Sequence, residues 1–534
     1  MTTVGMYLSR LLEAYGIEVV FGIPGVHTVE LYRGMEGTRL RHVTPRHEQG
    51  AGFMADGYAR ATGRPAACFI ITGPGMTNIA TAMAQAYADS VPMLVVSAVN
   101  ALGDLGSGAG WLHELKDQRL LVQGVCEFSH TLTSPAELND VVARAFAVFS
   151  GARPRPVHIE LPLDIITASA EGLPPVEAAP LPARPAAAAE PLRQAAQWLD
   201  EARAPVLLFG GGAQDVGPLA RQLAEAADAP AVMTVNGRGL LAPGHPLAVP
   251  CNPAATSVIE LIEASDLVVA VGTELGPTEY DFMGTGMARF TGRSIRIDVD
   301  PQQLARTRSA SLPIVADARE ALAALLPLIG KRQRQGAERA AAARSHTLEG
   351  FPATYGWLIA LMEIIRDTLP GVVIAGDSTQ PVYAGAVGFA AAASRRWFCS
   401  ATGFGTLGYA LPAAIGARIG RPDVPVVCLT GDGGFQFSLQ ELASAREAGT
   451  PVIVVLWNNF SHGEIKSYML SRGIAPVGVD LFTPDFQTLA RAFDCHALRL
   501  GSPGELPAAL RAAAAQDKPT VIEIDEKAYL SAPA

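Results

Sequence analysis

Short apolar runs rich in Val and Ile alternate along the chain with longer Ala- and Leu-rich stretches of helical period. This alternation is typical of parallel sheets covered by helices, because a strand that is buried on both faces reads as a continuous apolar run. The runs fall into three groups, over residues 19–22, 67–72, 93–97 and 157–161, over 206–209, 231–235, 267–271 and 295–298, and over 372–375, 426–430, 452–456 and 521–524. The pattern predicts an α/β protein with three doubly wound parallel sheets.

Two stretches of different composition separate the three groups. Residues 168–191 are rich in Pro and Ala, which favours an extended, semi-rigid connector. Residues 331–349 are charged and rich in Ala, which predicts a solvated helix. These boundaries predict an N-terminal domain over residues 1–167, a middle domain over 190–330 and a C-terminal domain over 350–534.

Composition and charge narrow the class of protein. The chain has 534 residues, and only 17% of them are charged against a typical ~25%, so a disordered chain and a small disulfide module are both excluded. The net charge is −10 and no run is rich in Lys or Arg, so nucleic acid is not an expected partner. Neither a secretion signal nor the ~18 uninterrupted apolar residues of a membrane span is present, and the six cysteines are scattered singly. We therefore expect a cytoplasmic protein that does not bind membranes.

The most informative motif follows the apolar run that ends at Thr430. Gly431, Asp432, Gly433 and Gly434 form a Gly-rich turn there, which lets backbone N–H groups approach a phosphate closely. Asn459 follows the next apolar run, 27 positions after Asp432. Because the carboxyl ends of parallel strands meet at one edge of a sheet, Asp432 and Asn459 are expected to share a Mg²⁺ ion bound to a diphosphate.

This motif resembles the cofactor motif of thiamine-diphosphate enzymes. Three longer segments, residues 47–60, 72–78 and 401–417, resemble corresponding stretches of the acetolactate synthase and benzoylformate decarboxylase superfamily. The resemblance covers the whole chain in order. It implies thiamine diphosphate and Mg²⁺ as cofactors, a pyrimidine-binding N-terminal domain, a Rossmann-like middle domain and a diphosphate-binding C-terminal domain.

The resemblance also implies roles for individual residues. Glu48 matches the acid that hydrogen-bonds the pyrimidine N1′ of thiamine, the Gly405 carbonyl matches the acceptor of the 4′-amino group, and Leu407 matches the aliphatic residue that bends the cofactor. The further expected cofactor contacts are Gly73, Pro74, Asn78, Thr379, Gln380, Gly431, Gly433, Gly434, His462 and Gly463, and the expected metal ligands are Asp432, Asn459 and the backbone carbonyl of Ser461. Helix capping alone would also account for Thr379.

One thiamine must bridge two domains, since Glu48 lies in the first domain and Asp432 in the last. In the family these two residues come from different subunits. We therefore expect a homodimer as the minimum active unit and a homotetramer as the assembly.

At several positions this sequence differs from known subfamilies of the superfamily, and these differences indicate which reaction it catalyses. Val26 stands where benzoylformate decarboxylase has Ser and pyruvate decarboxylase has Asp, so neither of these polar groups is reproduced. His27, His113 and Glu114 lie in the matching segments and are candidates for proton transfer to the product. Each histidine would alternatively be a structural residue.

Acidic residues suggest the substrate. Glu464 stands where acetolactate synthases carry an apolar Met beside the substrate, and Glu274, Glu279 and Asp281 follow the run that ends at Val271. Carboxylates in a crevice suit a guanidinium, which has a fork of N–H donors. Residues 21–32 and 459–466 most resemble 5-guanidino-2-oxopentanoate decarboxylases, which predicts conversion of that 2-oxo acid to the guanidino-aldehyde and CO₂. A solvated acidic loop is the alternative reading of the carboxylates after Val271.

Two other functions remain open at this stage. One is an acetolactate-synthase-like carboligase, with FAD in the middle domain at residues 209–212, although three glycines after a strand are a weak sign of a nucleotide. The other is a non-catalytic nucleotide-binding relic. The presence of Glu48, Asp432 and Asn459 favours an enzyme.

Overall fold

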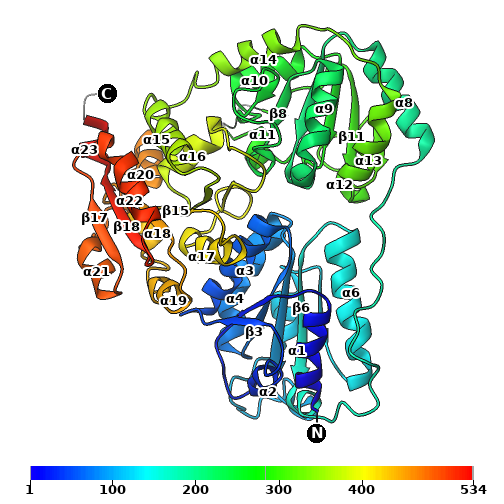
Figure 1. Cartoon of the computed structure of the whole chain (residues 1–534), viewed down its shortest axis with the longest axis vertical. Coiled ribbons are helices and arrows are strands. Elements are labelled where there is room, and N and C mark those ends of the chain that lie inside the picture. The colour runs from blue at the N-terminus through cyan, green and yellow to red at the C-terminus, as the bar shows by residue number, and fades with distance from the viewer. Residues whose placement is uncertain (1, 283, 285, 532–534) are drawn as a thin grey trace.

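The computed structural model describes residues 2–282, 284 and 286–531. It contains three six-stranded sheets, and the paired strands of each sheet run parallel to one another. Figure 1 shows the sheets in three lobes that follow one another along the chain. The predicted α/β class with three parallel sheets is confirmed.

The N-terminal sheet has the strand order β2-β1-β3-β4-β6-β5. Its strands are β1 (Val19–Gly22), β2 (Arg41–Val43), β3 (Ala66–Ile70), β4 (Met93–Val99), β5 (Phe128–Thr131) and β6 (Pro156–Pro162). The helices of this part are α1 (Val4–Ala14), α2 (Val29–Arg33), α3 (Glu48–Thr62), α4 (Pro74–Ala88), α5 (Gln118–Gln123), α6 (Leu138–Gly151) and α7 (Leu163–Ile166). The inner strands are buried along their whole length, which explains their continuous apolar sequence.

The middle sheet has the order β12-β11-β10-β7-β8-β9. Its strands are β7 (Pro205–Phe209), β8 (Ala231–Met233), β9 (Ala248–Val249), β10 (Leu267–Val271), β11 (Arg293–Asp298) and β12 (Leu312–Val315). The accompanying helices are α8 (Ala189–Glu201), α9 (Gly217–Ala227), α10 (Thr256–Glu263), α11 (Pro277–Tyr280), α12 (Pro301–Ala305), α13 (Ala318–Leu325) and α14 (Gly336–Ser345). Helix α14 lies in the stretch predicted to be helical between the second and third groups of runs.

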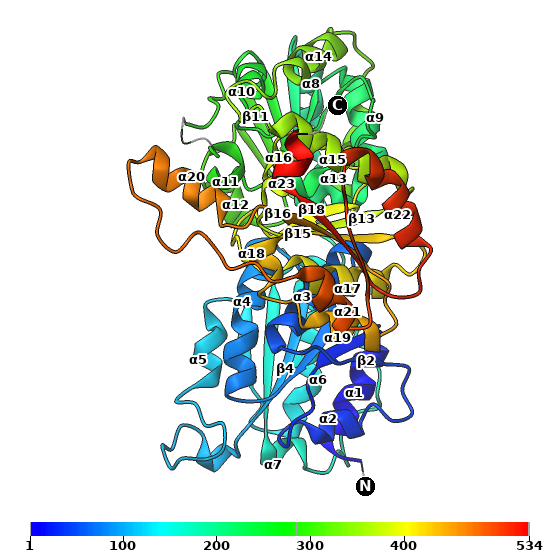
Figure 2. The ribbon, with the colours of Figure 1, turned by 90° about the vertical axis from the view of Figure 1, so that its left-hand side faces the viewer.

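The C-terminal sheet has the order β14-β13-β15-β16-β18-β17. Its strands are β13 (Val373–Gly376), β14 (Trp397–Cys399), β15 (Val426–Gly431), β16 (Ile453–Asn458), β17 (His496–Arg499) and β18 (Thr520–Asp525). Its helices are α15 (Tyr355–Thr368), α16 (Gln380–Gly388), α17 (Ala410–Gly420), α18 (Asp432–Phe435), α19 (Glu441–Glu447), α20 (Gly463–Ser471), α21 (Phe486–Ala492), α22 (Leu506–Ala514) and α23 (Glu526–Ser531). Figure 2 shows α20 standing away from the body of the molecule.

Helices α3 and α17 join the first and third parts of the chain. One continuous apolar core contains residues of both helices, among them Met54 and Ala413. The backbones approach so closely that a Cβ atom on Gly57 would overlap the Ala413 carbonyl, and one on Gly416 would overlap the Met54 carbonyl. Figures 1 and 2 both show α17 lying against α3. The N-terminal and C-terminal parts are therefore packed as one body through small residues.

No helix in the described part of the chain is both long enough and apolar enough to cross a membrane.

Candidate active site

The Gly-rich turn and the second predicted metal ligand lie at the same edge of the C-terminal sheet. Strands β15 and β16 are neighbours, and Gly431 is the register partner of Trp457. Asp432 begins α18 directly after β15, and the backbone N–H of Asn459 donates to Asp432 Oδ1 at 3.5 Å. Asp432 is 1% exposed, and within the described residues its Oδ2 has no hydrogen-bond partner. Burial raises the pKa of this carboxyl, and a bound cation would lower it.

The remaining predicted metal ligands lie on the loop that follows β16. Asn459 Oδ1 accepts a hydrogen bond from the backbone N–H of Ser461 at 3.2 Å, and Asn459 Nδ2 donates to Gln380 Oε1 at 3.3 Å. The structure therefore brings Asp432, Asn459 and Ser461 together. A carboxylate, an amide oxygen and a backbone carbonyl are hard oxygen donors, the set that Mg²⁺ prefers. The donor set thus fits the predicted ion.

Three glycines give the turn its close packing. A Cβ atom on Gly431 would lie 2.9 Å from Thr379 Oγ1, and one on Gly433 would lie 2.8 Å from His462 Cε1. A Cβ atom on Gly434 would lie 2.9 Å from Asp377 Oδ2. The absence of side chains in the turn therefore brings polar groups from two other loops against the backbone where a diphosphate is expected.

Asp377 is a residue of this site that sequence reasoning missed. Its side chain is fully buried and accepts hydrogen bonds from the backbone N–H groups of Ser378 and Gly408. Burial raises its pKa to about 6. Because Gly408 ends the loop of Gly405 and Leu407, Asp377 connects that loop to the Gly-rich turn. The signal in the sequence was a carboxylate directly after a buried apolar run.

Thr379 and Gln380 stand at the start of α16. The Thr379 side chain makes no capping hydrogen bond, so helix capping does not account for it. Gln380 Oε1 accepts from Trp457 Nε1 at 3.2 Å as well as from Asn459. Both residues therefore face the loops that carry the predicted metal ligands.

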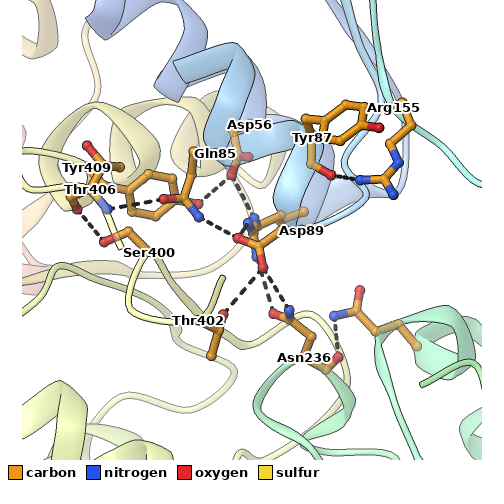
Figure 3. A network of polar contacts seen from close by, with 12 residues as sticks. Asp56, Gln85, Tyr87, Asp89, Arg155, Asn236, Ser400, Thr402, Thr406 and Tyr409 are labelled. Atoms are coloured by element: carbon orange, nitrogen blue, oxygen red, sulfur yellow. Dashed lines mark hydrogen bonds and ion pairs between the residues drawn. The ribbon is translucent and has the colours of Figure 1, made fainter. Parts of the chain in front are cut away.

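A buried polar network around Asp89 holds the loop that contains Gly405 and Leu407 (Figure 3). The Asp89 carboxylate accepts hydrogen bonds from four side chains, those of Arg60 at 2.5 Å, Gln85 at 2.5 Å, Asn236 at 3.3 Å and Thr402 at 3.4 Å. Gln85 Oε1 accepts from the backbone N–H of Thr406 at 3.4 Å. Since Thr406 lies between Gly405 and Leu407, residues of all three parts of the chain position this loop.

Glu48 opens α3 and lies beside the start of α4. Glu48 is 9% exposed, and its carboxylate accepts a hydrogen bond from Asn78 Nδ2 at 2.9 Å. Gly73 caps α4 with a φ of +70°, and Pro74 is the first residue of that helix. The four N-terminal residues expected at the cofactor, Glu48, Gly73, Pro74 and Asn78, are therefore neighbours.

His27 and His113 form a pair next to Gly73. Their ring centroids are 5.5 Å apart, and both Nδ1 atoms are buried without a hydrogen-bond partner among the described residues. Burial lowers the pKa of His27, and the neighbouring His113 lowers it further. His113 has a φ of +61°, and its backbone lies where a Cβ atom on Gly73 would stand. Two buried histidines without a hydrogen-bond partner for Nδ1, one of them with a positive φ, are more typical of a functional site than of a core whose polar groups are all hydrogen-bonded.

Glu114 has a different environment from the two histidines. Its carboxylate accepts hydrogen bonds from the backbone N–H groups of Gly108, Gly110 and Trp111, and from the Ser107 hydroxyl. These backbone groups lower the pKa of Glu114. Both carboxylate oxygens are thus used to shape the loop before His113. Val26, beside His27, is 68% exposed.

Comparison with known proteins decides the family. The chain matches the N-terminal thiamine pyrophosphate binding domain of thiamine pyrophosphate enzymes over residues 2–121, their central domain over 192–325 and their C-terminal binding domain over 377–524. The chain is a thiamine pyrophosphate enzyme. Thiamine pyrophosphate is another name for thiamine diphosphate, so the family predicted from the motifs is confirmed.

Curated relatives of this thiamine pyrophosphate enzyme include a probable 2-ketoarginine decarboxylase and several acetolactate synthases. A probable 2-ketoarginine decarboxylase of Pseudomonas aeruginosa is 45% identical over 528 residues, or 98% of this chain and 94% of that protein. The acetolactate synthase large subunit of Corynebacterium glutamicum is 32% identical over 97% of this chain and 85% of its own length. Acetolactate synthase isozyme 1 of Escherichia coli is 30% identical over 99% and 95%.

Glu464, the predicted substrate residue of this thiamine pyrophosphate enzyme, lies in the second position of α20 and is partly buried. Burial raises its pKa, and a hydrogen bond with Gln380 opposes that rise. Burial also raises the pKa of Tyr383 to about 12, with a contribution from the Glu464 charge. Because Gln380 contacts Asn459 as well, Glu464 lies next to the predicted metal loop.

Sequence reasoning also missed Glu526, the first residue of α23. Its Oε2 is buried without a hydrogen-bond partner in the described part of the chain. Burial raises the pKa of Glu526, and the charges of Asp432 and Glu464 raise it further. The signal was its position at the carboxyl end of the last apolar run, beside Asp525.

The other three acidic candidates, Glu274, Glu279 and Asp281, follow strand β10 of the middle sheet. Glu274 forms an ion pair with Arg153, and Glu279 and Asp281 accept hydrogen bonds from backbone N–H groups. Burial raises the pKa of Glu279 to about 7. Glu274 and Glu279 line a cavity of about 320 Å³ together with residues 210–212, the segment predicted for FAD as the alternative. Neither Glu464 nor any residue predicted to hold thiamine lines this cavity.

Proposed function

We propose that this enzyme decarboxylates 5-guanidino-2-oxopentanoate, also called 2-ketoarginine, without oxidation. The reaction breaks the bond between the carboxylate and the 2-oxo carbon, releases CO₂ and adds one proton to that carbon, giving the guanidino-aldehyde. The observation that carries the proposal is Glu464, a partly buried carboxylate beside the predicted metal loop. The 45% identity to a probable 2-ketoarginine decarboxylase supports it.

The proposed cofactors are thiamine diphosphate and Mg²⁺. The buried, unpartnered Asp432 Oδ2 and the oxygen donors of Asn459 and Ser461 fit a magnesium ion, and the close-packed turn of Gly431, Gly433 and Gly434 fits a diphosphate. When bound, thiamine diphosphate supplies the electron sink that a 2-oxo acid needs in order to lose CO₂.

Protein side chains would move protons at both ends of the site. Glu48 would hold a proton at the pyrimidine N1′, since its carboxylate is almost fully buried and has only the Asn78 amide as a hydrogen-bond donor among the described residues. The His27–His113 pair would supply the proton that the product aldehyde gains. A pKa lowered by burial makes His27 a ready proton donor once it is charged.

The cationic end of the substrate would lie against Glu464. A guanidinium offers two parallel N–H groups to a carboxylate, and such charge-assisted bonds are stronger than neutral ones in a partly buried site. Tyr383 and Gln380 would orient that carboxylate.

A homodimer is the proposed minimum unit, and a homotetramer the proposed assembly. No hydrogen bond or ion pair within the described residues joins Glu48 to the Asp432 turn. Large apolar side chains are exposed next to both halves of the site, Trp111 and Leu112 beside His113 and Phe404, Phe437 and Phe460 beside the C-terminal loops. Apolar surface of this kind favours burial against a second copy.

A carboligase related to the acetolactate synthases is the second candidate. The identities of 30–32% to these enzymes support it. The two reactions share the loss of CO₂ and differ in the organic product, which is an aldehyde for the decarboxylase and acetolactate for the carboligase with pyruvate.

Replacement of Glu464 tests the proposed substrate. In Glu464→Gln, we expect KM for 5-guanidino-2-oxopentanoate to rise about 10- to 100-fold, because one charge-assisted hydrogen-bonded pair is lost. KM for 2-oxooctanoate, which has the same main-chain length and no charge at its end, should stay within about 2-fold. Steady-state CO₂ release measures both values.

Glu274→Gln is the matched control, because Glu274 lines the separate cavity. We expect it to leave both KM values unchanged. If Glu464→Gln raises KM equally for the two substrates, or if Glu274→Gln has the larger effect on the guanidino acid, Glu464 does not bind the guanidinium.

A further inference from the structure

Glu441 is a buried carboxylate that belongs to one domain and binds the backbone of another. It opens α19 in the C-terminal part and is 0% exposed. The backbone N–H of Arg46 donates to Oε1 at 3.0 Å and to Oε2 at 3.1 Å. The hydroxyl of Ser444, one turn along the same helix, donates to Oε2 at 2.6 Å. The carboxylate is therefore held by its own helix and aimed at the turn that leads into α3.

That turn carries Glu48 two residues after Arg46. His47 is the N-cap of α3 and Glu48 its first residue, so a shift of the Arg46 amide moves the start of the helix. A Cβ atom on Gly50 would lie 2.5 Å from Glu441 Oε1, which shows how closely the carboxylate approaches this first turn. The positive end of the α3 dipole also faces the carboxylate, which offsets part of the cost of burying it.

Two further contacts join the same helix to the same segment. Arg46 Nη2 pairs with Glu447 Oε2 at 2.6 Å, and Arg41 Nη2 donates to the carbonyl of Ala448 at 2.7 Å. These two contacts are exposed, so they contribute little, whereas the Glu441 contact is shielded from water.

We propose that Glu441 is a positioning residue that fixes the Arg46–Glu48 turn and so holds the Glu48 carboxylate at the pyrimidine N1′. The proposal rests on the role of Glu48 in the proposed function. Glu441 touches neither the substrate nor the cofactor region, and it acts through the backbone of the residues before Glu48. A carboxylate that donates or accepts a proton at one atom loses most of its effect when it is displaced by about 1 Å.

The test compares Glu441→Ala and Glu441→Gln with Glu447→Gln as the matched control. Glu447 lies on the same helix and contacts the Arg46 guanidinium but not its backbone. Two readouts are measured: amide hydrogen exchange of the peptide over residues 44–50 without cofactor, and exchange of the thiazolium C2 proton with Mg²⁺ and thiamine diphosphate bound.

In Glu441→Ala we expect peptide 44–50 to exchange about 10-fold faster and the C2 proton to exchange about 10- to 100-fold more slowly, while KM for the 2-oxo acid stays within about 3-fold. Glu441→Gln keeps an oxygen acceptor for the Arg46 N–H, and the Ser444 hydroxyl can accept from its amide, so both rates should return to within about 3-fold of wild type. Glu447→Gln should match wild type in both.

Wild-type C2 exchange in a folded Glu441→Ala protein overturns the proposal, even if peptide 44–50 exchanges faster. If Glu441→Ala does not fold, Glu441→Asp, which withdraws the carboxylate by one methylene, carries the same test. Glu48→Gln separates the two claims. If that variant leaves C2 exchange unchanged, the role of Glu48 fails, and the amide exchange of peptide 44–50 still reports whether Glu441 holds the turn.

Discussion

Burial raises the pKa of several carboxyl groups in the C-terminal part, and the surroundings of three of them, Asp377, Asp432 and Glu441, differ. Asp377 and Glu441 each accept backbone N–H groups, which satisfy their buried oxygens. Asp432 keeps one buried oxygen without a partner in the described part of the chain. A divalent cation is the ligand that such an oxygen accommodates best, so the surroundings of Asp432 suit its predicted role as a metal ligand, whereas those of Asp377 and Glu441 suit structural roles.

Glu441 gives the stability of the chain an unusual pH dependence. Burial raises its pKa from the ordinary 4.5 to about 7, so the folded chain holds a proton that the unfolded chain releases in this range. The protonated Glu441 carboxyl therefore stabilises the folded chain fully below pH 4.5, and this stabilisation is lost as the pH rises to about 7. Relative to Glu441→Gln, we expect wild type to lose about 1–3 kcal/mol between about pH 5 and pH 8. Thermal unfolding at each pH measures this difference, and parallel profiles for the two proteins would contradict it.

At the scale of single residues, the sequence could bring together residues that follow neighbouring strands. Asp432, Asn459 and Ser461 could be placed together because strand ends share an edge of the sheet. The contact between Glu441 and Arg46 joins residues 395 positions apart in the C-terminal and N-terminal parts of the chain, and no local pattern predicts it. Asp377 and Glu526 each follow a strand directly, so the rule that found Asp432 would also have found them.

At the scale of elements, the apolar runs correspond to the four inner strands of each sheet. No apolar run predicted the two edge strands of each sheet, which are β2, β5, β9, β12, β14 and β17. Five of the six are incompletely buried or very short: β12 alternates buried and exposed residues, β17 has no buried residue, and β9 has two residues. A run of apolar residues marks burial on both faces, so an edge strand does not produce one.

The close packing of α3 against α17 predicts how a substitution in their contact changes the stability of the chain. Because a Cβ atom on Gly57 would overlap the Ala413 carbonyl, Gly57→Ala must push the two helices apart, and we expect a loss of about 1–3 kcal/mol in the free energy of unfolding. Gly124→Ala is the control, since Gly124 faces open space and has a φ of −76°. It should change stability by less than about 0.5 kcal/mol. Chemical denaturation measures both, and equal effects would refute the close approach of the helices.

At the scale of the whole molecule, the carboxylates that the sequence suggested for the substrate separate into two places. Glu464 lies at the predicted metal loop, whereas Glu274 and Glu279 line the cavity of the middle part. Both sets stand near carboxyl ends of parallel strands, but the strands belong to different sheets. The sequence rule locates residues at the edge of a sheet and does not say which sheets face one another.

Subunit complementation tests the proposed assembly. Glu48→Gln and Asp432→Ala should each be inactive alone. If each site combines Glu48 of one subunit with Asp432 of the other, a mixed dimer contains one intact site, and a 1:1 mixture after subunit exchange should regain about a quarter of wild-type activity. Activity is measured after dissociation and reassociation of the mixed variants. No recovery, with mixed dimers shown by mass spectrometry, would mean that each site forms within one chain.

Product analysis tests the proposed reaction and its substrate together. The protein is incubated with Mg²⁺ and thiamine diphosphate, and 5-guanidino-2-oxopentanoate, pyruvate and benzoylformate are offered separately. We expect the guanidino acid to have the highest kcat/KM and to yield equal amounts of CO₂ and guanidino-aldehyde, with no turnover when Mg²⁺ or thiamine diphosphate is omitted. Acetolactate from pyruvate as the main product, with no aldehyde from the guanidino acid, would contradict it.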